Sequence, residues 1–259
     1  MKRPRLNMTV RPVMTLVVSV LLLAGSPFAA TADDDVVDPV AMATASIGQL
    51  EQASSISADV QIAEEAVLSS GLKIKSLREG IVTLQRGEPG IGFIFTRKGA
   101  LIDQTMSYDG DRLFMLGNKV KAIVSMPASG TVDQLMDNMV EAGAYLPGRD
   151  LFYTDAAQGL LEDVLESSYG GLAPVNGESC HYLSFRGPDV DWHLWVSVET
   201  QLPCKYMITS KWMTAAPEFE MDFSNWKLNA PVAVSTFRIS APDGYTQATG
   251  FDVLQPTYD

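Results

Sequence analysis

The side chains best suited to chemistry are two histidines, His181 and His193, and two cysteines, Cys180 and Cys204. A structural zinc site needs four ligands, and the hairpin expected over this stretch offsets the two imidazoles by one cross-strand position. Motifs such as G-x-S-x-G, H-E-x-x-H, the phosphate-binding loop and G-x-G-x-x-G do not occur at a strand–helix junction. The sequence therefore predicts a protein without enzymatic activity, metal or cofactor, although it leaves open a Ser–His–Asp site assembled by the fold.

Acidic side chains are a second potential source of chemistry. Glu162, Asp163 and Glu166 fall on one expected helix, where they could act as general acids or bases. A charge run on a helix is more typical of a solvated face. We therefore expect no catalytic carboxylate pair there.

The first 32 residues have the pattern of a signal peptide. Four Lys and Arg side chains precede an apolar run from Val13 to Ala24, and small residues follow at Ala30–Ala32. The run is shorter than the roughly 20 apolar residues of a membrane span, and no Cys stands at the cleavage site for lipid attachment. We predict cleavage near Ala32, export to the periplasm and a soluble mature protein with one domain over residues 33–259.

The charge balance narrows the possible partners. The chain has 19 Lys and Arg against 31 Asp and Glu, a formal charge of −12. Removing residues 1–32 removes four positive charges and no negative ones, which leaves 15 against 31, or −16. Such an acidic protein is not expected to bind nucleic acid or an anionic membrane surface.

The two cysteines give conflicting indications. An even count in an oxidising compartment favours a Cys180–Cys204 disulfide. In a simple meander, however, they lie on strands separated by a third, about 9–10 Å apart and beyond the roughly 7 Å limit between Cα atoms. The expected register also places them on opposite faces. We therefore expect free or conditionally paired thiols, which a bulge in the second strand would overturn.

Helices and strands, which the sequence pattern predicts, must position these side chains. Asp38 followed by Pro39 predicts a helix that runs to about Ala53. From Ser55 to Pro127, short apolar or alternating runs separated by Gly-containing turns predict an antiparallel meander.

The second half of the chain begins with two more expected helices. Thr131 and Gln134 form a capping box for the first, and the second is expected to begin at Asp155 and end at Gly170–Gly171. Strands then resume at Cys180, and the last of them covers Ser235–Ile239. The elements predict an α+β fold.

Short segments spread over the mature chain resemble a known family. From about Asp38 to Tyr245 the chain is similar to predicted periplasmic proteins of domain of unknown function 2092, which are related in fold to the lipoprotein carriers LolA and LolB and to the LppX group. The resemblance implies a strongly curved antiparallel half-barrel, LolA-like, covered by two to three helices with an apolar cavity between the layers. The resemblance implies no catalytic residue in this chain. The segments that carry it are Tyr108–Gly110, Phe114, Met126–Pro127, Cys180–Tyr182, Phe185–Arg186, Val190–Trp195, Phe237–Ile239 and Pro242–Gly244.

The hairpin around Gly187–Asp189 allows its faces to be assigned. If Arg186 pairs with Val190, Tyr182 pairs with Leu194 and Cys180 with Val196. Both faces of these strands are then partly apolar, which predicts cover by helices on one side and partial cover on the other.

Aromatic and methionine side chains on the expected inner elements are candidates for an apolar ligand site. They could equally be ordinary core packing, because a helix that carries Met is more often core than lid. As a site they would form an adaptable pocket for an acyl chain or an amphipathic peptide. The candidates are Phe93, Phe95, Met136, Met139, Tyr182, Trp192 and Trp195.

Two functions follow from these observations. The first is an exported binding protein that carries an apolar ligand, namely a lipid or a lipoprotein acyl chain. The alternative is a structural or interaction module of the cell envelope whose core is filled by its own side chains and whose partner is another envelope protein.

Overall fold

The computed structural model describes residues 37–142, 144 and 146–250. The expected signal peptide, residues 1–32, therefore lies outside the described residues. Within them the chain forms three α-helices, α1 (Pro39–Gln52), α2 (Val132–Glu141) and α3 (Ala156–Leu161). Two short 3₁₀ helices are present in the same part of the chain, η1 (Arg149–Phe152) and η2 (Val234–Phe237).

The described strands form one sheet of twelve, in the order β12-β6-β5-β4-β3-β2-β1-β11-β10-β9-β8-β7. All neighbours are antiparallel except β12 and β6. The sheet is open, because β12 and β7 are not paired to each other. The strands are β1 (Ser55–Val67), β2 (Lys73–Gly87), β3 (Gly90–Gly99), β4 (Asp103–Tyr108), β5 (Arg112–Gly117), β6 (Ala122–Pro127), β7 (Glu166–Val175), β8 (Glu178–Arg186), β9 (Val190–Ser197), β10 (Pro203–Ser210), β11 (Glu218–Leu228) and β12 (Thr246–Gln247).

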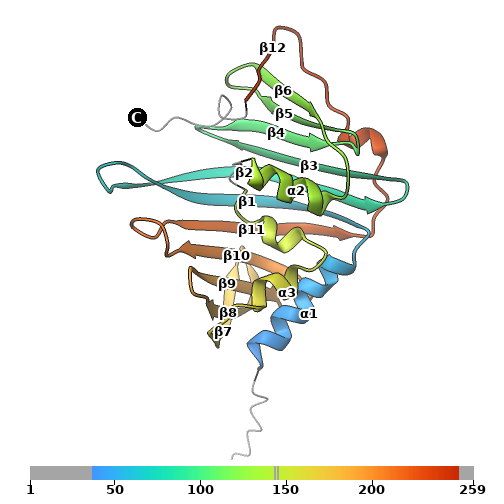
Figure 1. Cartoon of the computed structure of the whole chain (residues 1–259). Helices are drawn as coiled ribbons and strands as arrows, with labels where there is room; N and C mark the ends of the chain where they lie inside the picture. Colours follow the sequence, from blue (N-terminus) through green and yellow to red (C-terminus); the bar gives the residue numbers. More distant parts are fainter. Residues whose placement is uncertain (1–36, 143, 145, 251–259) are drawn as a thin grey trace, which may run out of the picture. The chain divides into compact units, whose positions relative to one another are not determined.

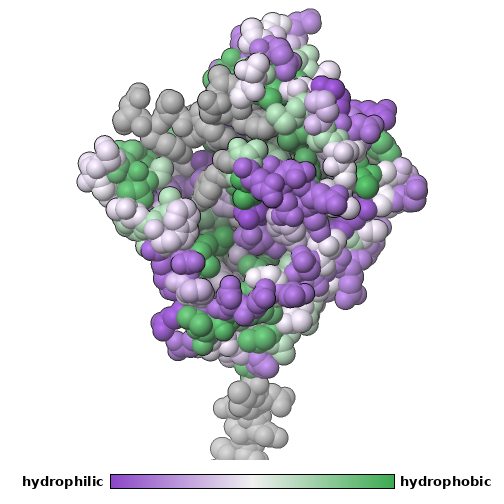
Figure 2. Space-filling view, in the orientation of Figure 1, coloured by the Kyte–Doolittle hydropathy of each residue, from purple (hydrophilic) through white to green (hydrophobic). Residues whose placement is uncertain are grey.

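The helices lie on one face of this curved sheet, α2 over β3 and α1 over β7–β9 (Figure 1). The helix-bearing face mixes hydrophilic and apolar side chains, with apolar atoms visible in hollows between the hydrophilic ones (Figure 2). The expected α+β fold with a helix-covered curved antiparallel sheet is confirmed.

The three predicted helix starts at Asp38, Thr131 and Asp155 are all present, and the first two are capped by side chains. The Asp38 carboxylate accepts hydrogen bonds from the backbone N–H groups of Val40 (2.9 Å) and Ala41 (3.2 Å) at the start of α1. Thr131 and Gln134 form the reciprocal capping box of α2. These caps satisfy N–H groups that have no partner within the helix.

Arg86, on β2, ties the helices to the sheet. Its guanidinium donates to the backbone carbonyls of Glu51 (3.3 Å) and Ala53 (2.9 Å) at the end of α1, and to that of Phe152 (2.8 Å) in η1. The Arg86 guanidinium also donates to the Leu50 carbonyl in the last turn of α1. One side chain thus satisfies the carbonyls at the end of one helix and holds the next helical segment.

The expected helix from Asp155 to Gly170–Gly171 is wrong in its extent. The helix ends at Leu161, and Glu166–Val175 forms β7. The Tyr182 ring on β8 occupies the space beside Gly170, where an added Cβ would lie 2.2 Å from its Cδ1 atom. Gly170 therefore lies within β7, at the irregularity between Tyr169 and Leu172, where the sequence pattern predicted a helix end.

The expected strand at Ser235–Ile239 is also wrong. Val234–Phe237 forms η2, and the Phe237 ring packs over Gly92 on β3, where an added Cβ would lie 2.1 Å from the ring. The Ser107 hydroxyl donates to the Phe237 carbonyl (2.6 Å). The segment is thus fixed by tertiary contacts and not by a sheet ladder.

The cysteines are bonded to each other, so the expectation of free thiols is wrong. The Cα atoms of Cys180 and Cys204 are 6.8 Å apart across β9. Pro203 pairs with Val196 and Lys205 with Trp195, so Cys204 is an extra residue in β10. This bulge brings Cys204 toward Cys180, which the regular meander would not do.

The disulfide should contribute strongly to stability. Replacing both Cys180 and Cys204 by Ser should lower the free energy of unfolding by about 3 kcal/mol, because the bridge closes a loop with a sequence separation of 24. Urea denaturation measures this loss. A reductant should bring the wild type to the level of the variant and leave the variant unchanged. Equal stability of wild type and variant would contradict this role.

Arg86→Met should lower the free energy of unfolding by about 3 kcal/mol, because the buried carbonyls at the end of α1 and in η1 lose their donor. Arg112→Met is the matched control. The Arg112 side chain is exposed, donates to the Ser125 hydroxyl and lies over the Phe114 ring, so its loss should cost less than about 0.5 kcal/mol. Denaturation of the two variants side by side tests this, and similar losses would show that Arg86 is not a special anchor.

Candidate functional site

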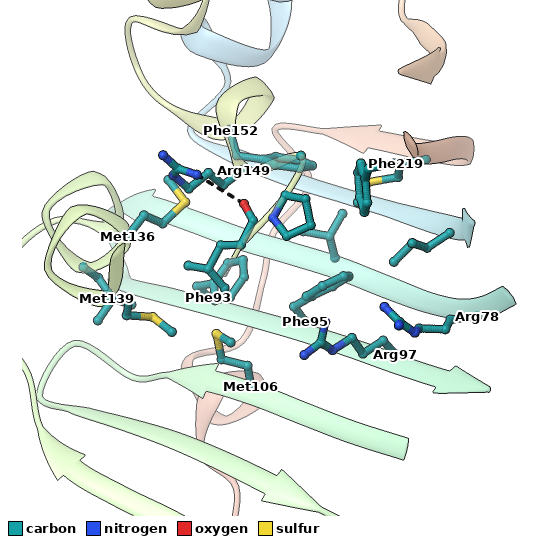
Figure 3. A pocket seen from close by; sticks show the side chains of 17 residues that line it. Arg78, Phe93, Phe95, Arg97, Met106, Met136, Met139, Arg149, Phe152 and Phe219 are labelled. Carbon is teal, nitrogen blue, oxygen red and sulfur yellow. Dashed lines mark hydrogen bonds between the residues drawn. The ribbon is translucent and has the colours of Figure 1, made fainter. Parts of the chain in front are cut away.

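An apolar cavity lies between α2, the segment before η1 and the inner face of the sheet (Figure 3). Its volume is about 60 Å³. Its walls are made by α2, by Leu146–Phe152 and by strands β1–β4 and β11. The lining residues are Ile62, Arg78, Val82, Phe93, Phe95, Arg97, Met106, Leu135, Met136, Met139, Leu146, Pro147, Gly148, Arg149, Phe152, Phe219 and Met221.

The sheet wall follows from strand alternation. Phe93 and Phe95 are two residues apart on β3, so both point to the inner face, and their ring centroids are 6.5 Å apart. Phe95 pairs with Val82 on β2 and with Met106 on β4. Side chains from three neighbouring strands thereby form a continuous apolar surface.

The helix wall follows from helical spacing. Leu135, Met136 and Met139 occupy one face of α2 and are all buried. In Figure 3, Met136 and Met139 lie at one end of the cavity, with Phe93 and Phe95 between them and the arginines Arg78 and Arg97. The unbranched thioether side chains can change rotamer to fit an irregular ligand.

Gly148 allows the segment before η1 to close over the sheet. Its φ angle is +79°, a left-handed conformation that glycine adopts without strain. An added Cβ would lie 2.8 Å from Cε1 of Phe219 and 3.2 Å from Cε of Met221. Only a residue without a side chain lets the backbone approach β11 so closely.

Polar groups in the lining are three arginines that bond to protein groups. Arg78 forms an ion pair with Glu64, and Arg97 donates to Gln104 Oε1 at 3.1 and 2.8 Å. Arg149 donates to the Tyr153 hydroxyl (3.2 Å) and to the Leu146 carbonyl (3.4 Å). The rest of the lining is almost wholly carbon and sulfur, so the cavity offers mainly dispersion and hydrophobic contact.

The structure brings together four of the seven candidate residues and separates the other three. Phe93, Phe95, Met136 and Met139 all line the cavity. Trp192 points to the same face of the sheet but lies away from the cavity, stacked on Phe185 with 3.9 Å between ring centroids.

Tyr182 and Trp195 lie on the opposite face of the sheet from Trp192. Arg186 pairs with Asp191 and not with Val190, so the register expected from the turn was wrong by one residue. A slip of one residue exchanges the faces of one strand relative to its neighbour.

The lining residues that sequence analysis did not single out come from distant strands. Met106, Phe219 and Met221 reach the cavity from β4 and β11. Each belongs to an alternating strand pattern, and this pattern is the only sequence signal that could have included them. Their meeting depends on the order of strands in the sheet.

Tyr182 and Trp195 form a separate aromatic cluster on the outer face. Their rings stack with centroids 4.7 Å apart, and the Tyr182 hydroxyl forms a 3.0 Å hydrogen bond with His193 Nδ1. The Lys205 Nζ atom lies 5.6 Å from the Trp195 ring centroid, within range of a cation–π contact. Burial lowers the pKa of His193 below its ordinary value of 6.5, in opposition to the nearby Asp191 and Glu218 carboxylates.

Within the described part of the chain, no helix has the length and apolar character that a membrane crossing requires.

Residues 41–249 match the model of a family described as predicted periplasmic protein (DUF2092). None of the curated proteins matches the chain significantly.

Solved structures with a similar arrangement share little sequence with this chain. Lipoprotein LppX from Mycobacterium tuberculosis is 13% identical, with a TM-score of 0.47 over 78% of this chain and 100% of LppX. LprF from Mycobacterium bovis is also 13% identical, with a TM-score of 0.47 over 76% of this chain and 95% of LprF. A LolA superfamily protein from Nitrosomonas europaea is 14% identical, with a TM-score of 0.35 over 79% of this chain and 99% of that protein.

Acid should destabilise the protein through His193. Because the pKa of His193 is lowered in the folded state, the unfolded chain takes up the proton first as the pH falls. The contribution of the neutral imidazole is therefore fully present above about pH 6.5 and is lost as the pH falls toward the folded pKa.

We expect His193→Gln to show a smaller fall in melting temperature than the wild type between about pH 7.5 and pH 5.5. Thermal unfolding followed by circular dichroism at each pH measures this. Normalising each protein to its own value at the higher pH removes the effect of the lost Tyr182 bond. Parallel curves would contradict the prediction.

Proposed function

The chain belongs to the DUF2092 family of predicted periplasmic proteins, and from that premise we propose that it binds the acyl or alkyl chain of a lipid or lipoprotein in the cavity beneath α2. The observation that carries the proposal is the lining, in which aromatic and methionine side chains face one another across a gap. An apolar cavity favours an apolar ligand because its walls offer no hydrogen-bond partners to a water molecule. The function is binding, without a chemical step.

Binding requires the cavity to expand. Its volume of about 60 Å³ is below the ~150 Å³ of an engineered apolar cavity that holds benzene. The walls that can yield are α2 and the segment before η1, since the opposite wall is a continuous sheet.

The movable walls are linked to each other. The Tyr153 hydroxyl donates to the Asp137 carboxylate of α2 (2.8 Å), and the Thr154 backbone N–H donates to Asp133 of α2 (3.0 Å). These bonds are exposed, and we infer that α2 and the segment around η1 move outward as one cover when a chain enters.

The small volume favours a second candidate function. A protein whose cavity is filled by its own side chains would act through contacts with another envelope protein. The edge strand β7 supports this alternative, because Leu165 beside it and Leu172 within it are 70% and 62% exposed.

Met139→Trp should block the cavity. The indole fills the space that the ligand needs, so the affinity for a dansyl-labelled undecanoic acid should fall about tenfold or more. Val140→Trp is the matched control, because Val140 is the next residue of α2 and is 36% exposed. It should keep the affinity of the wild type.

Fluorescence titration measures both affinities, and thermal unfolding confirms that both variants fold. Native mass spectrometry of the wild type, purified from the exported fraction of its host, should show a bound acyl-chain species that Met139→Trp lacks. An apo mass together with no uptake of the probe by the wild type would overturn the carrier proposal in favour of the interaction module.

A further inference from the structure

A second and larger hollow lies on the same face of the sheet as the cavity. It measures about 640 Å³ and is bounded by η1 and α3 on one side and by the ends of β9 and β10 on the other. We call it the acidic groove. Of the described residues, Arg149 alone lines both the groove and the apolar cavity, so the two sites are distinct.

Carboxylates dominate the rim of the acidic groove. Five aspartates line it against a single arginine, Arg149. Asp137 accepts from the Tyr153 hydroxyl, and Asp150 lies 3.9 Å from the Arg149 guanidinium. The five are Asp137, Asp150, Asp155, Asp163 and Asp189.

Three of these carboxylates keep their charge uncompensated. Among the described residues, no Lys or Arg forms an ion pair with Asp155, Asp163 or Asp189. The Lys211 ammonium, on the loop beside the groove, is bound to Asp191 (2.6 Å) and to the Gly187 carbonyl (2.6 Å). The groove therefore has a surplus of negative charge toward solvent.

The floor and one wall of the groove are apolar and aromatic. Trp192 and Ile208 come from β9 and β10, and Trp212 lies on the loop that follows β10. Trp212 is 67% exposed, which is unusual for a large aromatic side chain and leaves its ring faces open to a ligand. A cation beside an indole face gains a cation–π attraction.

The Tyr206 hydroxyl is an unused polar group that faces this groove. Tyr206 is 1% exposed and lines the groove, yet within the described part of the chain nothing hydrogen-bonds its hydroxyl. Tyr108, which is equally buried, donates to the carbonyls of Gly110 (2.9 Å) and Gly130 (2.7 Å). The Tyr206 oxygen is not among the fully buried unpartnered side-chain atoms of the described residues, so it reaches the groove, where it can bond to water or to a ligand atom.

The aspartates do not form a metal site. Among the described residues, the one group of potential ligand atoms that converges within 4.8 Å involves Glu178 and the two disulfide cysteines, and none of the groove carboxylates. Dispersed carboxylates around an apolar floor suit an organic cation, which is larger than a metal ion and has an apolar part.

We propose that the acidic groove binds an organic ammonium ion with an apolar body. The aspartates of the rim attract the ammonium group into the groove, where it donates a hydrogen bond to the Tyr206 oxygen, while the body contacts Trp192 and the Trp212 ring. The volume falls in the usual range for small-molecule sites. This site goes beyond the proposed function, since apart from Arg149 its lining residues differ from those of the cavity and its ligand carries a positive charge.

Three probes with one common body test the proposal. 4-Phenylbutylamine is a cation at neutral pH, 4-phenylbutanol is neutral and 4-phenylbutyrate is an anion. Titration of the full mature protein, followed by tryptophan fluorescence and calorimetry, should give an affinity for the amine about tenfold or more above that for the alcohol, and no binding of the carboxylate. Added salt should weaken the binding of the amine.

Variants locate the site. Asp163→Asn combined with Asp189→Asn should weaken amine binding about tenfold, whereas Asp243→Asn, an exposed aspartate outside the groove, should leave it unchanged. Tyr206→Phe should also weaken binding while leaving the melting temperature unchanged, because no described residue forms a hydrogen bond with the hydroxyl. Trp212→Ala should remove the fluorescence response.

Equal affinities for the three probes, no binding of the amine, or full binding by the double aspartate variant would overturn the proposal. Met139→Trp separates this result from the proposed function. It should lower the affinity for the dansyl fatty acid about tenfold or more and leave amine binding intact, so either site can fail without the other.

Discussion

The hydrogen bonds of Arg86 are the constraint on which the arrangement of the helical layer depends. A sheet that carries helices on one face has to fix them at their ends, where backbone carbonyls lack partners. Arg86 does so from β2, near the middle of the sheet, by binding the end of α1 and the Phe152 carbonyl. Burial lowers the pKa of this guanidinium, but an arginine remains charged at physiological pH and gives strong bonds to carbonyls.

The segment that Arg86 holds also separates two chemically different sites. Phe152 lines the apolar cavity, Asp150 lines the acidic groove, and Arg149 borders both. Arg149 donates to the Tyr153 hydroxyl (3.2 Å), which in turn bonds to α2. A chain of hydrogen bonds therefore connects the cover of the cavity to the edge of the groove.

Strand register decides which aromatic side chains can share a site. Phe93 and Phe95 were correctly placed together because they lie two residues apart on one strand, and strand alternation then requires a common face. Tyr182 and Trp192 lie on different strands, so their relative orientation depends on a turn. One residue of difference in that turn moved Tyr182 to the outer face. The bulge at Cys204 also changes the local register. It brings Cys204 close enough to Cys180 for a disulfide, where free thiols were expected.

The sequence by itself determined the α+β class, the starts of α1 and α2 and the buried face of α2, because caps and helical periodicity act over a few neighbouring residues. It also indicated Phe93, Phe95, Met136 and Met139 as members of one apolar surface. Only the tertiary structure decided the end of α3 and the conversion of residues 166–175 to β7, since pairing with β8 outweighs local preference there. The meeting of β4 and β11 side chains in the cavity, and of aspartates from separate segments around the acidic groove, was likewise decided by strand order and loop packing, which depend on contacts between residues far apart in the chain.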